Sequence, residues 1–297
     1  MKQFLVLLLA GFSFQLLAEP LQTELAPLGE VIVTSLPSAP FPHPNRAQGY
    51  TNKTKFFPAD KHYSNSTVAI FIPKGFKPQK KTDFIVHFHG WGGDVTNVFR
   101  IYKVAEQLVE SRRNAILVVP QGPFQASDSF DGKLEDENGF KRFMADVMVT
   151  LKERGVSKAD KIGKIVLSGH SGGYQVMSSI VAQGGLSDQV KEVWLFDALY
   201  AQTEKFTKWS DTYHGKILDI YTENGGTRKG SEALMDDLKK RHVKFVGKNE
   251  SEITAKDLQK NRLVFIYTSL KHNDVVHQHN TFRDFLNASC FDKTKAK

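Results

Sequence analysis

The stretch Lys164-Ile-Val-Leu-Ser-Gly-His-Ser-Gly-Gly-Tyr174 decides the fold of this chain. It begins with a short apolar, β-branched run, which is typical of a buried strand. The next five residues, Gly169-His-Ser-Gly-Gly173, fit the pattern G-x-S-x-G, and a helix-compatible segment follows from about Tyr174. Small flanking residues let a strand turn sharply into a helix, which lifts the central serine out of the sheet. We therefore expect Ser171 to be a nucleophile, in preference to a purely structural glycine turn.

A second glycine-rich segment, His89-Gly-Trp-Gly-Gly93, follows the apolar run Phe84-Ile-Val-His-Phe88. In acyl transfer, backbone N–H groups must point at the oxygen that becomes negative. We expect one such group from Gly172, directly after the nucleophile, and a second from Trp91. Gly90 lets the backbone approach a substrate closely because it carries no side chain. This segment is the predicted oxyanion loop.

Strand-like and helix-like segments alternate on both sides of these two motifs. Apolar runs predict strands at Thr67–Pro73, Phe84–Phe88, Ala115–Val119, Lys164–Ser168, Val193–Phe196, Ile217–Tyr221 and Leu263–Tyr267. Helical periodicity or composition predicts helices at about Val95–Ser111, Phe140–Leu151, from Tyr174, Ser231–Arg241 and near Val275–Asn287. This alternation predicts an α/β fold, with a mainly parallel central sheet covered by helices on both faces.

The motifs together carry a family resemblance. They are Phe71-Ile-Pro-Lys-Gly75, His89-Gly-Trp-Gly92, Pro120-Gln-Gly122 and Gly169-His-Ser-Gly172. The series resembles the α/β-hydrolase superfamily, most closely its secreted esterases and its polyester or carbohydrate-ester hydrolases. The resemblance runs from about Thr67 to the C-terminal helix and implies the α/β-hydrolase fold, a serine nucleophile and no cofactor. The segments Asn45–Tyr63 and Asp128–Glu137 match nothing in it.

The resemblance also implies the order serine, acid, histidine along the chain, with the histidine just after the last strand. Three histidines meet this condition: His272, His277 and His279. His272 lies between the last strand and the final predicted helix, whereas the other two fall inside that helix. We expect His272 to be the general base, with His277 as the alternative.

The acid of a Ser-His-Asp triad has two candidates. Its commonest position, the loop after Ile217–Tyr221, holds no aspartate but does hold Glu223. The loop after the preceding predicted strand begins with Asp197, and some superfamily members take their acid from that loop. Either carboxylate could fix the tautomer of the imidazole and stabilise the imidazolium. We favour Asp197 and keep Glu223 as the alternative.

The N-terminus predicts export. Lys2 is followed by the apolar run Phe4–Leu17, and Ala18 precedes Glu19. This arrangement is typical of a secretory signal peptide cut after residue 18, which predicts a secreted or periplasmic protein. Residues 19–66 are rich in Pro, Ser and Asn, so we expect an extension with little regular structure that wraps the surface. The catalytic domain is expected at residues 67–297.

Composition argues against several other classes. The net charge is +8, but the basic residues form short, separated clusters, and we expect no nucleic-acid partner. No apolar run of spanning length follows the N-terminus, so we expect no membrane span in the mature chain. Cys290 is the only cysteine and has no internal disulfide partner. No zinc pattern occurs, and the acidic loop Asp128–Glu137 fails the EF-hand spacing, so we expect no metal.

These features predict a hydrolase that cleaves carboxylic esters, acting on a small-molecule or polymeric substrate through an acyl-enzyme. Two alternatives remain at this point. A peptidase acting on peptides or cell-wall stems would use the same triad, and a non-catalytic binding protein could have kept the fold while its acid was displaced.

Overall fold

The computed structural model describes residues 20–294, so the predicted signal peptide lies outside the described residues. Nine strands of the described chain form one sheet in the order β1-β4-β6-β5-β7-β8-β9-β11-β10. Their bounds are β1 Gly29–Ser35, β4 Thr67–Pro73, β5 Lys81–Phe88, β6 Ile116–Pro120, β7 Lys161–His170, β8 Val190–Phe196, β9 Lys216–Thr222, β10 Val246–Asn249 and β11 Leu263–Thr268. A separate hairpin pairs β2, Tyr50–Asn52, with β3, Lys55–Phe57.

The sheet is mainly parallel. Only the pairs β1–β4 and β4–β6 are antiparallel in this described sheet, and the remaining neighbours run parallel from β6 to β10. The prediction of a mainly parallel α/β sheet is therefore confirmed. Carboxyl ends of parallel strands meet at one edge of a sheet. The loops that follow β5, β7, β8, β9 and β11 consequently lie at the same edge.

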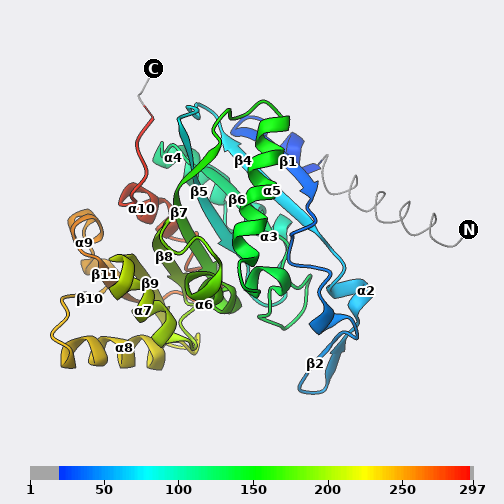
Figure 1. Ribbon diagram of the computed structural model, residues 1–297. Coiled ribbons are helices and arrows are strands. Elements are labelled where there is room, and N and C mark those ends of the chain that lie inside the picture. The colour runs from blue at the N-terminus through cyan, green and yellow to red at the C-terminus, as the bar shows by residue number, and fades with distance from the viewer. Residues whose placement is uncertain (1–19, 295–297) are drawn as a thin grey trace, which may run out of the picture.

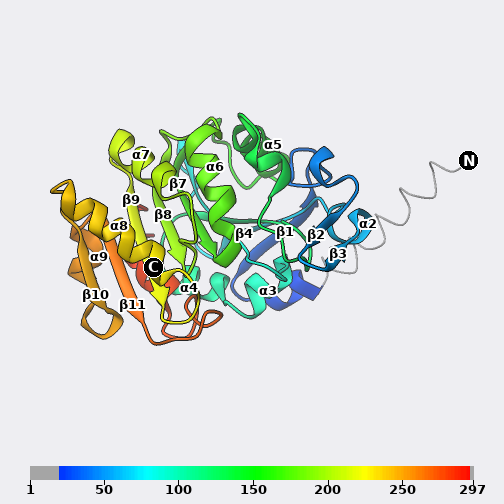
Figure 2. The same cartoon turned by 90° about the horizontal axis from the view of Figure 1, so that it is seen from below.

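Helices cover both faces of the sheet (Figures 1 and 2). One face carries α5 Gly139–Glu153, α6 Tyr174–Gln183, α7 Thr203–Tyr213 and α8 Arg228–Lys240. The other face carries α3 Val95–Arg100, α4 Val104–Ser111, α9 Ala255–Lys260 and α10 Thr281–Asn287, and the short α2 spans Ala59–His62. Each face has its own apolar core, with Phe140, Phe143 and Trp209 in one and Phe99, Trp194 and Phe282 in the other.

Two helix predictions need correction. The predicted helix Val95–Ser111 is two helices, because Lys103 has a left-handed backbone (φ 51°) that interrupts it between α3 and α4. The last helix begins at Thr281 rather than near Val275, after Asn280 at φ 57°. His277 and His279 therefore lie in turns before α10, and not inside a helix as the sequence pattern suggested. Sequence reasoning also missed β10, α7 and α9.

The N-terminal extension is more regular than predicted. Residues 29–35 form β1, which pairs antiparallel with β4 from Gly29 opposite Pro73 to Ser35 opposite Thr67. The expectation of little regular structure was wrong here because no proline falls within residues 29–35: Pro20 and Pro27 precede the strand, and Pro37 follows it. The irregular, proline-rich part leads on to the β2–β3 hairpin.

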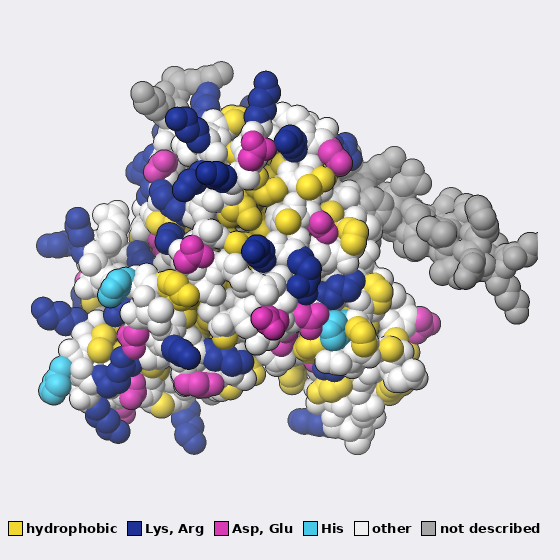
Figure 3. Space-filling view, viewed as in Figure 1, with side chains coloured by type: hydrophobic (Ala, Val, Ile, Leu, Met, Phe, Trp, Pro, Cys, Tyr) yellow, Lys and Arg dark blue, Asp and Glu magenta, His cyan; other side chains and the backbone are white. Residues whose placement is uncertain are grey.

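The surface viewed in Figure 3 carries Lys and Arg side chains at many separate places, with Asp and Glu among them. Among the described residues, no helix is both long enough and apolar enough to cross a membrane.

Asp219 is a buried carboxyl group within β9. Its Oδ2 accepts a hydrogen bond from Ser231 Oγ at 2.6 Å, whereas Oδ1 has no partner among the described residues. Burial raises the pKa of Asp219 to about 7. The native state thus holds this proton more tightly than the unfolded chain, in which the pKa of Asp is about 4. The resulting stabilisation is fully present below about pH 4 and is lost as the pH rises towards 7.

Replacing Asp219 by Asn puts a permanently neutral group in the same place. We compare the free energy of unfolding of Asp219→Asn with that of wild type at the same pH. The difference between them should grow, in favour of the variant, by about 1–3 kcal/mol as the pH is raised from 5 to 8. Urea unfolding of both proteins at the two pH values measures this difference. Asp236→Asn, on the exposed side of α8, is the matched control. A difference for Asp219→Asn no larger than that control would contradict the prediction.

Candidate active site

Ser171 lies on a sharp turn between β7 and α6. β7 runs between β5 and β8 and ends at His170, and residues Ser171–Gly173 form the short 3₁₀ helix η3 before α6 begins. The backbone of Ser171 is left-handed, with φ 52°. Non-glycine residues rarely adopt this conformation, and it is concentrated at functional sites. The turn leaves Ser171 partly exposed while His170 and Gly172 on either side are buried.

Asp197 and His272 form a hydrogen-bonded pair at the same edge of the sheet. Asp197 follows β8, has a left-handed backbone (φ 47°) and is fully buried. Its Oδ2 accepts a hydrogen bond from His272 Nδ1 at 2.6 Å and one from Thr222 Oγ1 at 2.8 Å. Its Oδ1 accepts from Thr222 N at 3.2 Å and from Thr227 Oγ1. The sequence pattern named both Asp197 and His272 but not the two threonines.

The electrostatics of this pair keep the carboxylate charged. Burial alone would raise the pKa of Asp197, but hydrogen bonds from His272, Thr227 and Thr222 outweigh it and lower the pKa below its usual value. A charged Asp197 accepts a hydrogen bond from His272 Nδ1–H. The proton of the neutral ring therefore resides on Nδ1, and Nε2 is left as the acceptor. The ring is thereby held in the tautomer that a general base requires.

Ser171 and His272 share two neighbours. The His272 ring lies with its centroid 4.5 Å from that of His170, the residue before Ser171. Tyr200, whose ring centroid is 6.5 Å from that of His272, donates to Gly225 O at 2.5 Å. Burial raises the pKa of Tyr200, whereas its interaction with Ser171 acts to lower it. No direct hydrogen bond joins Ser171 to His272 among the described residues.

The predicted oxyanion loop lies against the serine turn. A Cβ added to Gly90 would come within 2.6 Å of Ser171 Cβ, so only glycine fits at this position. The backbone N–H of Trp91 has no hydrogen-bond acceptor among the described residues. The N–H of Gly172 lies in the first turn of η3, where no intrahelical partner exists. Two free N–H groups next to Ser171 could together bind an anionic oxygen.

His89 holds this loop in shape. Its Nδ1 donates to Gly90 O at 2.9 Å, and its Nε2 accepts from Gly122 N at 3.1 Å and from Gln121 Nε2 at 2.9 Å. Burial lowers the pKa of His89, which keeps the ring neutral in this arrangement. Sequence reasoning quoted both His89 and the Pro120-Gln-Gly122 motif without linking them. Their common position after neighbouring strands was the signal that could have linked them.

The acidic loop Asp128–Glu137 also contacts the site. Ser129 Oγ accepts a hydrogen bond from the Trp91 indole at 2.7 Å, and Trp91 as a residue is 55% exposed. Glu135 accepts from Gln175 Nε2, in the first turn of α6, at 3.1 and 3.2 Å. Asp128 forms an ion pair with Arg46 from the N-terminal extension. This loop therefore forms a wall beside the serine turn, a position that the sequence did not reveal.

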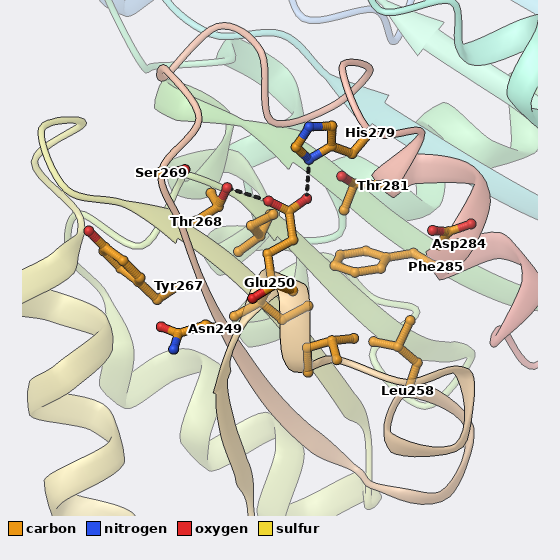
Figure 4. A pocket seen from close by; sticks show the side chains of 14 residues that line it. Asn249, Glu250, Leu258, Tyr267, Thr268, Ser269, His279, Thr281, Asp284 and Phe285 are labelled. Carbon is orange, nitrogen blue, oxygen red and sulfur yellow. Dashed lines mark hydrogen bonds and ion pairs between the residues drawn. The ribbon is translucent and has the colours of Figure 1, made fainter.

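The alternative acid and bases lie elsewhere. Glu223 is exposed and pairs with Arg228 and with the Tyr267 hydroxyl. His279 Nδ1 pairs with Glu250 Oε1 at 2.9 Å, and both residues line a cavity of about 560 Å³ (Figure 4). His277 Nδ1 is buried without a partner among the described residues. Among His272, His277 and His279, only His272 contacts Asp197, the carboxylate beside the serine turn.

Comparison with solved structures defines the class of fold. The chain is similar to the feruloyl esterase module from Clostridium thermocellum, with a TM-score of 0.54 and 12% identity over 88% of each chain. The chain therefore has the α/β-hydrolase fold, which the sequence resemblance implied. FphF, a fluorophosphonate-binding serine hydrolase of Staphylococcus aureus, is similar with a TM-score of 0.52 and 11% identity over 88% of this chain and 99% of that one. No protein-family model and no curated protein matches the sequence.

Proposed function

We propose that this protein is a serine hydrolase that cleaves carboxylic esters. Ser171 is the nucleophile, His272 the general base and Asp197 the acid that orients His272. The observation that carries the proposal is the 2.6 Å hydrogen bond between His272 Nδ1 and buried Asp197, at the sheet edge where the strained turn presents Ser171. The α/β-hydrolase fold, which an esterase module and a serine hydrolase share, supports it.

The proposed reaction has two steps. Ser171 Oγ attacks the ester carbonyl while its proton passes to His272 Nε2, and the N–H groups of Trp91 and Gly172 bind the resulting oxyanion. His272 then returns the proton to the departing alcohol, which leaves an acyl group on Ser171. Water attacks this acyl-enzyme with His272 again as base, and the acid product leaves with Ser171 restored. No cofactor enters these steps.

Replacing Asp197 by Asn should lower kcat by about 10⁴-fold, because an amide lets the imidazole take the unproductive tautomer. Glu223→Gln, at the alternative acid, should change kcat by less than threefold. Steady-state kinetics with p-nitrophenyl acetate at neutral pH measures both. If Glu223→Gln proved the more damaging substitution, the acid would be Glu223 and the assignment of Asp197 would fail.

The choice between esterase, peptidase and binding protein needs a matched pair of substrates. An ester and an amide that carry the same acyl group, such as a p-nitrophenyl ester and the corresponding p-nitroanilide, compare the first two directly. We expect hydrolysis of the ester and little of the amide. FphF binds fluorophosphonates, so a fluorophosphonate is the probe for the nucleophile, with the modified residue located by mass spectrometry. Folded wild type that neither hydrolyses the ester nor reacts with the probe would favour a binding protein.

We also propose that the protein is exported, with a signal peptide comprising residues 1–18. The basic residue Lys2, the apolar run up to Leu17 and the small residue Ala18 support this. Expression of the full chain in a bacterial host, followed by N-terminal sequencing of the periplasmic or secreted fraction, should give a mature protein that begins at Glu19. Retention of Met1 on cytoplasmic protein would contradict export.

A further inference from the structure

His170, the variable residue of the G-x-S-x-G motif, supports the loop that carries His272. Its Nε2 lies 2.8 Å from the backbone O of His272, and the two ring centroids are 4.5 Å apart. His170 is 2% exposed, so this contact is shielded from water. The same residue therefore adjoins Ser171 along the chain and the proposed base through space.

The second ring nitrogen of His170 is also occupied. Tyr102, in the segment between α3 and α4, places its hydroxyl 3.0 Å from His170 Nδ1. A backbone oxygen can only accept, so the proton of neutral His170 resides on Nε2 and Nδ1 accepts from the tyrosine. Both partners thus select a single tautomer. Tyr102 Oη, His170 and His272 O form a continuous hydrogen-bonded chain from the α3–α4 segment to the base.

The charge state of His170 suits this role. The pKa of His170 is lowered to about 3, mainly by burial and in part by the neighbouring His272. The ring therefore stays neutral at ordinary pH, although Asp197 acts in the opposite direction and His89 in the same direction as His272. A cation so close to His272 would oppose the imidazolium that forms on it when Ser171 loses its proton. A neutral donor fixes the base without that penalty.

Among the described residues, the bond from His170 is the one that holds the His272 backbone, and the next anchor along the loop is buried Val276, whose O accepts from Gln107 Nε2 at 3.3 Å. Residues 269–280 contain turns but no helix or strand. The Asp197 bond holds the His272 ring, whereas the His170 bond holds its backbone. Further along, the loop is attached through His279 to Glu250, which also accepts from Thr268 Oγ1 at 2.5 Å (Figure 4). Shifts of about 1 Å in a catalytic group can reduce rates by about 10²-fold.

We infer that His170 is a positioning residue for the base: it donates to the His272 carbonyl, accepts from Tyr102 and so sets the distance between His272 and Ser171. This inference rests on the proposed function. It gives the variable residue of the serine motif a defined chemical requirement, namely a neutral side chain with a donor at the position of Nε2. Glutamine can meet this requirement through its side-chain amide, whereas leucine cannot.

The first test compares substitutions that keep or remove the donor. His170→Leu should lower kcat for p-nitrophenyl acetate by about 10- to 100-fold with KM within threefold, because the base is displaced while the substrate still binds. His170→Gln should restore at least half of the change in log kcat that His170→Leu causes. Tyr102→Phe should lower kcat by about three- to tenfold. His62→Leu is the matched control, since His62 is another buried histidine that contacts a backbone oxygen, Phe124 O at 2.6 Å.

A second readout does not depend on turnover. The proton in the His272–Asp197 hydrogen bond should give a far-downfield NMR signal in wild type that is absent from Asp197→Asn. In His170→Leu this proton should exchange with water at least tenfold faster than in wild type, which broadens the signal. His170→Gln and His62→Leu should retain the signal. Identical exchange in wild type and His170→Leu, or equal kcat losses for Leu and Gln at His170, would overturn the inference. If wild type gives the signal but no hydrolysis, the proposed function fails separately, and the exchange rates still decide the role of His170.

Discussion

Ser171→Ala should lower kcat for ester hydrolysis by roughly 10⁵- to 10⁶-fold, the size of loss expected when the nucleophile of a serine triad is removed. The substitution deletes one oxygen atom from a partly exposed side chain, so the fold should persist. Alanine can still adopt the turn because the strand before it and the helix after it are unchanged. The expected loss is therefore chemical, since no other side chain at the turn can form the acyl-enzyme.

The measurement combines turnover with covalent labelling. Wild type should take up one fluorophosphonate on the peptide that contains Ser171, and Ser171→Ala should take up none. Ser178→Ala is the control, because it removes a hydroxyl from α6, the helix that follows the serine turn. Among the described residues this hydroxyl donates only to Gln175 O, at 2.7 Å, so the variant should keep kcat within threefold. Purified Ser171→Ala with more than a tenth of wild-type activity would exclude Ser171 as the nucleophile.

His272→Ala is expected to cause a loss of the same order, about 10⁵- to 10⁶-fold in kcat. Without an imidazole, the Ser171 hydroxyl keeps its proton at neutral pH and is a poor nucleophile. Asp197 would also lose its hydrogen bond from His272 Nδ1 and remain as a buried carboxylate held by Thr222 and Thr227. Labelling of Ser171 by the fluorophosphonate should slow in parallel with turnover, because both need the same activated oxygen.

The neighbouring histidines supply the comparison for this prediction. His279→Ala breaks an exposed pair with Glu250 and should change kcat by less than tenfold. His277→Ala removes a ring that stacks on Tyr102, with centroids 6.1 Å apart, and should also have a small effect. All three variants should be compared at equal folded concentration, verified by thermal melting. A loss in His277→Ala that equals the loss in His272→Ala would return the base assignment to the alternative histidine.

Much of the fold was predictable because its signals are local. The strand Thr67–Pro73 was predicted with its observed bounds, since a continuous apolar run between turn residues is a property of the sequence itself. The helix at Phe140–Leu151 was recognised from one apolar face, and the structure extends it only to Gly139–Glu153. Element ends were less predictable, because Lys103 and Asn280 adopt left-handed conformations that their residue types do not specify.

The pairing within the site was less accessible. Asp197 and Glu223 both follow parallel strands, so the sequence puts two carboxylates at the same sheet edge and cannot rank them by contact. Their surroundings differ in the folded protein. Asp197 is buried and faces His272, which lies 75 residues further along the chain. Glu223 is exposed and is turned towards Arg228 and Tyr267.

The sequence by itself determined the class of fold and the candidate nucleophile, because apolar periodicity and the glycines around Ser171 act over a few neighbouring residues. Only the tertiary structure decided which acid meets which histidine, that β1 joins the sheet, and that His170 contacts the His272 loop. These contacts join segments far apart in the sequence. They depend on the order and twist of the strands, and on the direction in which each loop leaves the sheet, which no local pattern encodes.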